Sequence, residues 1–135
     1  MTEAGTLGRV MLIDDERVDQ MMYKRILKRS GMVDDVIGFL YAKEALGYLA
    51  DPSSSKVDLI LLDINMPAMN GFEFLEAARE TMNDVGIPVV MMLTTSMSPD
   101  DKLRAKQYPE IKAYTNKPLI QAHLELAAKI VAYGR

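Results

Sequence analysis

The chain has 135 residues, no cysteine and a formal net charge of −3, with 49% hydrophobic and 26% charged residues. This length suits one domain with a single core, and the lack of cysteine excludes disulfides, thiolate metal sites and cysteine nucleophiles. There is no basic run, no secretory signal, and no apolar run near the roughly 20 residues that span a bilayer, so we expect a cytoplasmic protein that binds neither nucleic acid nor membrane.

Short apolar runs alternate along the chain with segments of helical spacing. In chain order, strands are predicted at 10–13, 36–40, 59–62, 89–93 and 113–115. Helices are predicted at 17–30, at 42–50, around 72–78, at 100–107 and at 119–133. Gly31 is a predicted C-cap of the first helix, and Ser98-Pro99 is a start signal for the fourth. The alternation predicts an α/β fold, in which helices cover both faces of a parallel sheet.

Polar residues follow four of the predicted strands at the point where each strand ends. They are Asp14-Asp15-Glu16, Asp63, Thr94-Thr95-Ser96 and Asn116-Lys117-Pro118. Ligands of open α/β sheets bind outside the carboxyl ends of the strands. The sequence therefore predicts that three carboxylates, a hydroxyl and an amine meet at one edge of the sheet.

The chemistry of this predicted cluster favours phosphoryl transfer. Clustered carboxylates repel one another unless they are protonated or neutralised by a cation. All the donors are hard oxygens, with no His or Cys among them, which favours Mg²⁺ over Zn²⁺ and leaves Mn²⁺ as an alternative. Lys117 and Thr94 are suited to binding phosphate oxygens. Asp63 is the candidate nucleophile, because it ends the strand expected at the centre of the sheet.

Four motifs in order resemble the receiver domain of two-component response regulators: Asp14-Asp15, LLDINMPAMNG at 61–71, LTTS at 93–96 and NKP at 116–118. The resemblance covers essentially the whole chain and is strongest to single-domain, chemotaxis-regulator-like members without an output domain. It implies one domain over residues 1–135, with a core at about 8–133. It also implies a flavodoxin-like three-layer sandwich, with a five-stranded parallel doubly wound sheet of strand order 2-1-3-4-5.

The resemblance further implies which residues hold the metal and the phosphoryl group. Asp63 falls on the phosphoacceptor. Asp15 falls on a direct Mg²⁺ ligand, and Asp14 on a position that binds the ion largely through water. Asn65 falls where the family uses a backbone carbonyl as a ligand, and Asp63 completes the predicted metal site.

Three further positions correspond to residues that sense the phosphoryl group. Lys117 falls on the phosphate-binding lysine, Tyr114 on the switch aromatic, and Thr94 on the switch hydroxyl. The interval from Thr94 to Lys117 is one residue longer than the commonest spacing, so counting back from the lysine would select Thr95 instead. We favour Thr94 and expect the extra residue within QYPEIK at 107–112.

The function implied by this resemblance is a signalling switch and not an enzyme, with slow self-phosphorylation from small donors and slow autodephosphorylation. A histidine kinase or histidine phosphotransfer protein would supply the phosphoryl group. The face formed by 100–107, 113–115 and 119–133 would then change its contacts with a downstream protein whose identity the sequence does not specify, or form a homodimer. A phosphatase with an aspartyl nucleophile is the main rival, but Asn65 stands where such enzymes commonly carry a second Asp as general acid.

Overall fold

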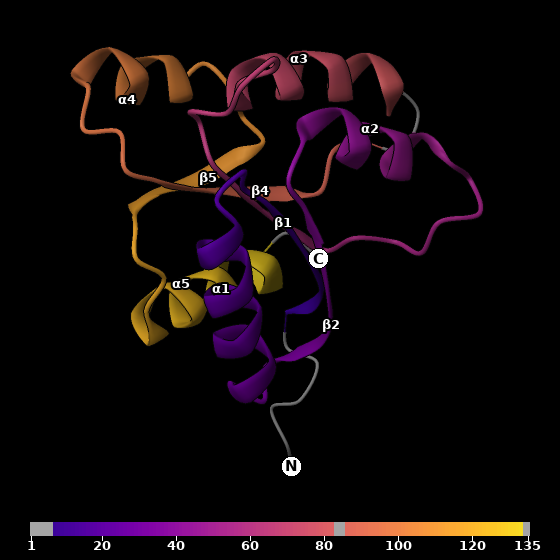
Figure 1. The fold of residues 1–135 in the computed structure, drawn as a ribbon, viewed down its shortest axis with the longest axis vertical. Helices are drawn as coiled ribbons and strands as arrows, with labels where there is room; N and C mark the ends of the chain where they lie inside the picture. The colour runs from indigo at the N-terminus through magenta and orange to yellow at the C-terminus, as the bar shows by residue number, and fades with distance from the viewer. Residues whose placement is uncertain (1–6, 83–85, 134–135) are drawn as a thin grey trace.

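A computed structural model describes residues 7–82 and 86–133, in which five parallel strands form one sheet of order β2-β1-β3-β4-β5 (Figure 1). The predicted fold class and strand order are therefore confirmed. Positions 1–6, 83–85 and 134–135 of the predicted domain lie outside the described residues. The strands are β1 (Gly8–Ile13), β2 (Val33–Phe39), β3 (Leu59–Leu62), β4 (Val89–Thr94) and β5 (Ile111–Asn116).

The helices form a layer on each face of the sheet, with α1 and α5 on one side and α2, α3 and α4 on the other (Figure 1). Their bounds are α1 (Arg17–Arg29), α2 (Ala42–Ala50), α3 (Gly71–Thr81), α4 (Pro99–Ala105) and α5 (Gln121–Tyr133). Within the described part of the chain, none of these helices has the length and apolar composition needed to cross a membrane.

Local signals set where two of the helices end or begin. Gly31 follows the C-cap of α1 with φ +74°, a left-handed conformation that glycine adopts without a steric penalty. Ser98 caps α4 by accepting a hydrogen bond from the backbone N–H of Asp101, and Pro99 occupies the first turn. The start of α4 agrees with the sequence prediction, whereas the C-cap of α1 is Ser30, one residue before the predicted Gly31.

The strand β2 begins earlier than predicted, at Val33 instead of residue 36. Among the described strands it pairs with β1 alone, at the edge of the sheet, and its early residues Asp34 and Asp35 are exposed. An edge strand tolerates charged side chains that would disrupt a buried strand, so an apolar run marks only part of β2.

The three central strands are buried on both faces, because alternate side chains enter the two helical layers. In β3, Leu59 and Leu61 pack on the α1/α5 side, whereas Ile60 and Leu62 pack on the α2/α3 side. β3 is hydrogen-bonded to β1 and β4 along its whole length. The residue after Leu62 is therefore held at the edge of a rigid sheet.

The turn from β3 into α3 brings the start of the helix against the end of the strand. Asn70 and Glu73 form a reciprocal capping box that begins α3. Ala68 supports the turn with φ +68°. A Cβ atom added to Gly71 would lie 2.6 Å from the backbone oxygen of Asp63 and 3.1 Å from Ile64 Cα. Gly71 is therefore required for this close approach.

We predict that Gly71→Ala lowers the free energy of unfolding by about 1–3 kcal/mol, because the new methyl group clashes with backbone atoms. Gly47→Ala is the matched control, since its Cβ meets nothing within 4 Å inside α2. That change should stabilise the protein by about 0.5–1 kcal/mol through the better helix propensity of alanine. Urea unfolding followed by circular dichroism measures both, and equal midpoints for the two variants would contradict the prediction.

Candidate functional site

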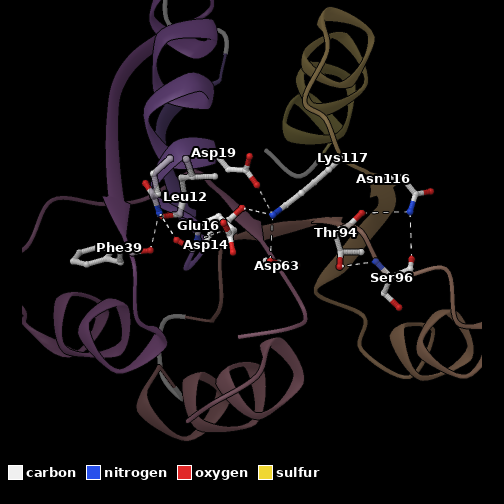
Figure 2. A network of polar contacts seen from close by, with 11 residues as sticks. Leu12, Asp14, Glu16, Asp19, Phe39, Asp63, Thr94, Ser96, Asn116 and Lys117 are labelled. Carbon is white, nitrogen blue, oxygen red and sulfur yellow. Dashed lines mark hydrogen bonds and ion pairs between the residues drawn. The ribbon is translucent and has the colours of Figure 1, made fainter. Parts of the chain in front are cut away.

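The carboxyl ends of β1 and β3 bring three carboxylates together at one edge of the sheet, and Figure 2 shows two of them, Asp14 and Asp63. Asp14 and Asp15 follow β1 and Asp63 follows β3, and each offers an oxygen that lies within 4.8 Å of the others. Asp14 is 1% exposed and Asp63 is 5% exposed, whereas Asp15 is half-buried. The structure thus places these three predicted site residues side by side.

Backbone hydrogen bonds hold the two buried carboxylates in position. The N–H of Asp63 donates to the carbonyl of Ile13 at 3.1 Å, and the N–H of Asp14 donates to the carbonyl of Phe39 at 3.1 Å. Asp14 Oδ1 also accepts from the N–H of Glu16 at 2.9 Å, just before α1 begins. Both side chains therefore project from anchored backbone and not from a free loop.

Lys117 reaches into the carboxylates from the end of β5, where it precedes a cis peptide bond to Pro118 (Figure 2). Its Nζ lies 2.7 Å from Asp14 Oδ2, 2.9 Å from Asp19 Oδ2 and 3.3 Å from Asp63 Oδ2. The lysine side chain is only 8% exposed. One ammonium group therefore serves three carboxylates in a largely dry environment.

Burial and charge act in opposite directions on the titration of this cluster. Burial disfavours the charged form of Lys117, but its hydrogen bonds to Asp14 and Asp19 outweigh that effect and hold the pKa of Lys117 above its ordinary value. Burial raises the pKa of Asp14 above its ordinary value, although the contact with Lys117 partly opposes the shift. The charged form of Asp14 is therefore disfavoured in the folded protein, and a bound cation would favour it.

The donor set fits a divalent cation. Asp63 Oδ1 is buried and has no hydrogen-bond partner among the described residues. The oxygens of Asp14, Asp15 and Asp63 are hard ligands, which suit Mg²⁺ and Mn²⁺ better than soft metals. Asn65, two residues after Asp63, has an exposed side chain.

Thr94 and Thr95 differ sharply in position. Thr94 is fully buried at the end of β4, and its Oγ1 accepts a hydrogen bond from the N–H of Ser96 at 3.1 Å. The N–H of Lys117 donates to the carbonyl of Thr94 at 3.0 Å, which ties that strand end to the lysine. Thr95 is exposed.

A bulge near the start of β5 accommodates one additional residue. Val90 pairs with Ile111 but Met91 pairs with Ala113, so Lys112 has no partner on β4. Lys112 is the last residue of the segment in which the extra residue was expected. With the bulge in place, Thr94 pairs with Asn116, directly before Lys117.

Tyr114 faces the loop between β4 and α4. Its hydroxyl donates to the carbonyl of Ser96 at 3.2 Å, and Lys102 Nζ lies 5.9 Å from the centre of its ring. The ring is half-buried. Because Ser96 also donates to Thr94, the predicted switch hydroxyl and the predicted switch aromatic contact the same residue.

Two residues at this site were missed by the sequence analysis. Asp19 binds Lys117 from the first turn of α1. Gln20 is buried, and its Nε2 lies at 2.8–3.2 Å from the carbonyls of Leu12, Asp14 and Phe39. In the sequence both are ordinary polar residues of an amphipathic helix. The one sequence signal for them was their position in the first turn of the helix that follows the Asp14-Asp15 pair.

Comparison with known proteins agrees with this geometry. The sequence model of the response regulator receiver domain family matches residues 10–129 of this chain. A solved response regulator receiver protein from Dyadobacter fermentans DSM 18053 superposes with a TM-score of 0.75 at 26% identity, covering 93% of this chain and 98% of that one. The chain therefore belongs to the response regulator receiver domain family, a class of protein used in two-component signalling.

Two curated relatives show how this domain occurs in other proteins. The chain is 38% identical over 91 residues to the two-component response regulator ARR17 of Arabidopsis thaliana, covering 62% of this chain and 59% of that protein. It is 28% identical over 131 residues to the hybrid signal transduction histidine kinase L of Dictyostelium discoideum, covering 96% of this chain and 7% of that protein. The chain thus spans less than two thirds of either relative.

We predict that Asp14→Asn raises the free energy of unfolding at neutral pH when divalent cations are removed with a chelator. Burial raises the pKa of Asp14 in the folded protein above the value of 3.8 that applies to the unfolded chain. The stability contributed by the protonated Asp14 carboxyl is therefore fully present below pH 3.8 and is lost as the pH rises through the folded-state pKa. The advantage of the variant should therefore appear above about pH 4 and grow toward neutrality, as measured by urea unfolding at a series of pH values.

Asp51→Asn is the control of opposite sign. Hydrogen bonds from Ser53 lower the pKa of Asp51, so its contribution is present at neutral pH and is lost as the pH falls. This variant should be less stable than the parent protein at neutral pH, with the deficit vanishing in acid. A lower neutral-pH midpoint for Asp14→Asn than for the parent protein would contradict the prediction for Asp14.

Proposed function

We propose that Asp63 accepts a phosphoryl group from a histidine kinase or a histidine phosphotransfer protein in a Mg²⁺-dependent reaction. The observation that carries this proposal is the state of the Asp63 carboxylate. It is buried at the end of a central strand, with Oδ2 3.3 Å from Lys117 Nζ and with no hydrogen-bond partner for Oδ1 among the described residues. A carboxylate so placed has one oxygen available as a nucleophile, beside groups that can neutralise a phosphoryl group.

The transfer forms one bond and breaks one. A carboxylate oxygen of Asp63 attacks the phosphorus of a phosphohistidine, the P–N bond breaks, and the imidazole leaves with the bonding electron pair and takes up a proton. Lys117, already 3.3 Å from Asp63, would bind a phosphoryl oxygen. Asp14, Asp15, Asp63 and the backbone carbonyl of Asn65 would hold Mg²⁺ or Mn²⁺, whose charge offsets that of the phosphoryl oxygens.

The hydrogen bonds around Ser96 support a route from the phosphoryl group to the surface. Thr94 can donate its hydroxyl proton to a phosphoryl oxygen, which would draw Thr94 and the bonded Ser96 toward Asp63. Tyr114 is bonded to the carbonyl of Ser96, so its ring would follow the same movement. The face formed by α4, β5 and α5 would then present a different surface to a downstream protein or to a second copy of the chain.

The proposed domain is a switch and not a catalyst of rapid turnover. Asn65 places an amide where aspartyl phosphatases commonly have a second carboxylic acid, so loss of the phosphoryl group should be slow. Slow self-phosphorylation from small donors follows from the same cluster of Asp63, Lys117 and a bound cation. The single-domain organisation, the cytoplasmic location and the homodimer stay predictions.

Incubation with Mg²⁺ and acetyl phosphate should add the mass of one phosphoryl group, and hydroxylamine should remove it because it cleaves acyl phosphates. Asp63→Asn is expected to abolish the adduct, and a chelator should slow its formation. Asp34→Asn is the matched control, since Asp34 is an exposed aspartate on β2. An adduct that persists in Asp63→Asn would contradict the assignment, and rapid turnover of phosphomonoesters would favour a phosphatase.

Beryllofluoride, a mimic of the phosphoryl group, should shift the backbone amide resonances of Ser96 and Tyr114 in the presence of Mg²⁺. Thr94→Ala is expected to remove most of this response, whereas Thr94→Ser keeps the hydroxyl and should retain it. Thr95→Ala serves as the neighbouring control, because Thr95 is exposed, and it should respond like the parent protein. If Thr95→Ala loses the response and Thr94→Ala keeps it, Thr95 is the switch residue.

A further inference from the structure

Lys117 is bound by one carboxylate that does not belong to the predicted cation site. Asp19 Oδ2 accepts a hydrogen bond from Lys117 Nζ at 2.9 Å, while Asp14, Asp15 and Asp63 are the carboxylates grouped closely enough to hold a metal ion. In Figure 2 Asp19 lies above the ammonium group, on α1, and Asp63 lies below it. The lysine is therefore positioned between the cation site and a separate anchor.

The lysine and a divalent cation would compete for the same two side chains. Asp14 and Asp63 are both within 3.3 Å of Lys117 Nζ, and both also belong to the group that can hold a metal. A cation that takes up the charge of these carboxylates weakens their attraction for the ammonium and repels it directly. The Lys117 side chain is only 8% exposed, so water does not replace the carboxylates as its partner unless the side chain moves out of the site.

Asp19 provides the lysine with a partner that the cation does not take. Its side chain is 25% exposed and, within the described part of the chain, Lys117 is its one side-chain hydrogen-bond partner. Before a cation binds, the ammonium is shared among three carboxylates. Once a cation binds Asp14 and Asp63, the ion pair between Lys117 and Asp19 is the one that the cation does not weaken by taking its carboxylate. Asp19 thus contributes more to the cation-bound state than to the cation-free state.

We propose that Asp19 is a positioning residue for Lys117, which lets a divalent cation enter the site while keeping the ammonium beside Asp63 for the incoming phosphoryl group. This inference rests on the function proposed above. It predicts that Asp19 supports cation binding through the lysine and not only through its own charge. It also gives a role to a side chain at the start of α1 that touches neither the cation nor the phosphoryl group.

The test is a double-mutant cycle on Mg²⁺ affinity, measured by isothermal titration calorimetry on the unphosphorylated protein. Asp19→Asn should weaken Mg²⁺ binding by roughly three- to tenfold, as expected for residues in one ion-pair network. Lys117→Met removes the competing ammonium and should bind Mg²⁺ more tightly than the parent protein. In the Lys117→Met background, Asp19→Asn should change the affinity by less than about twofold, because the lysine through which it acts is absent.

Three further variants separate positioning from general effects of charge and folding. Asp19→Glu keeps the charge and should restore most of the affinity. Asp100→Asn removes a charge from the exposed first turn of α4 and should leave Mg²⁺ affinity nearly unchanged. Asp19→Ser is a second uncharged variant, and urea unfolding identifies any variant that fails to fold.

The outcomes distinguish this inference from the function on which it rests. Equal losses on Asp19→Asn in both backgrounds would show that Asp19 acts only through its own charge, and would overturn the inference. Unchanged or tighter binding in Asp19→Asn would also overturn it, while the proposed phosphoacceptor role of Asp63 would stand. If the parent protein binds no Mg²⁺, the metal dependence of the proposed function fails and the inference fails with it.

Discussion

The candidate site depends most on one constraint: two carboxylates, Asp14 and Asp63, are buried side by side at the ammonium group of Lys117. Buried like charges repel, and Lys117 alone serves three acidic partners. Burial raises the pKa of Asp14, and Asp63 Oδ1 has no hydrogen-bond partner among the described residues. Buried clusters of titratable groups are frequent at functional sites, which supports the proposed binding of a cation and a phosphoryl group.

The fold keeps this unfavourable arrangement in place by anchoring the backbone on every side. β3 is paired with strands on both edges, and the N–H of Asp63 donates to the carbonyl of Ile13, so the backbone at Asp63 is anchored. Gly71 lets α3 close against the carbonyl of Asp63, and Gln20 donates to the carbonyls that surround Asp14. The stability of the core thus offsets the cost of burying these carboxylates.

The same geometry connects the site to the surface through a short set of contacts. Ser96 donates to Thr94 and accepts from Tyr114, so one loop residue joins the edge of the carboxylate cluster to β5. On the other side, Asp19 joins Lys117 to α1. In the proposed function, a charge change at Asp63 would have two routes outward, one through Ser96 toward α4 and one through Asp19 toward α1.

The sequence by itself determined the α/β class, the order of elements and the strand ends that carry Asp14, Asp63 and Lys117, because short apolar runs and the polar residues that follow them are local signals. Local signals also set the end of α1 before Gly31 and the start of α4 after Ser98. Only the tertiary structure decided the early start of β2, the burial of Thr94 against the exposure of Thr95, and the pairing of Asp19 with Lys117. These features depend on strand order, on a bulge at Lys112 and on a helix packed against the sheet, and residues 98 positions apart carry no mark of their pairing in the chain.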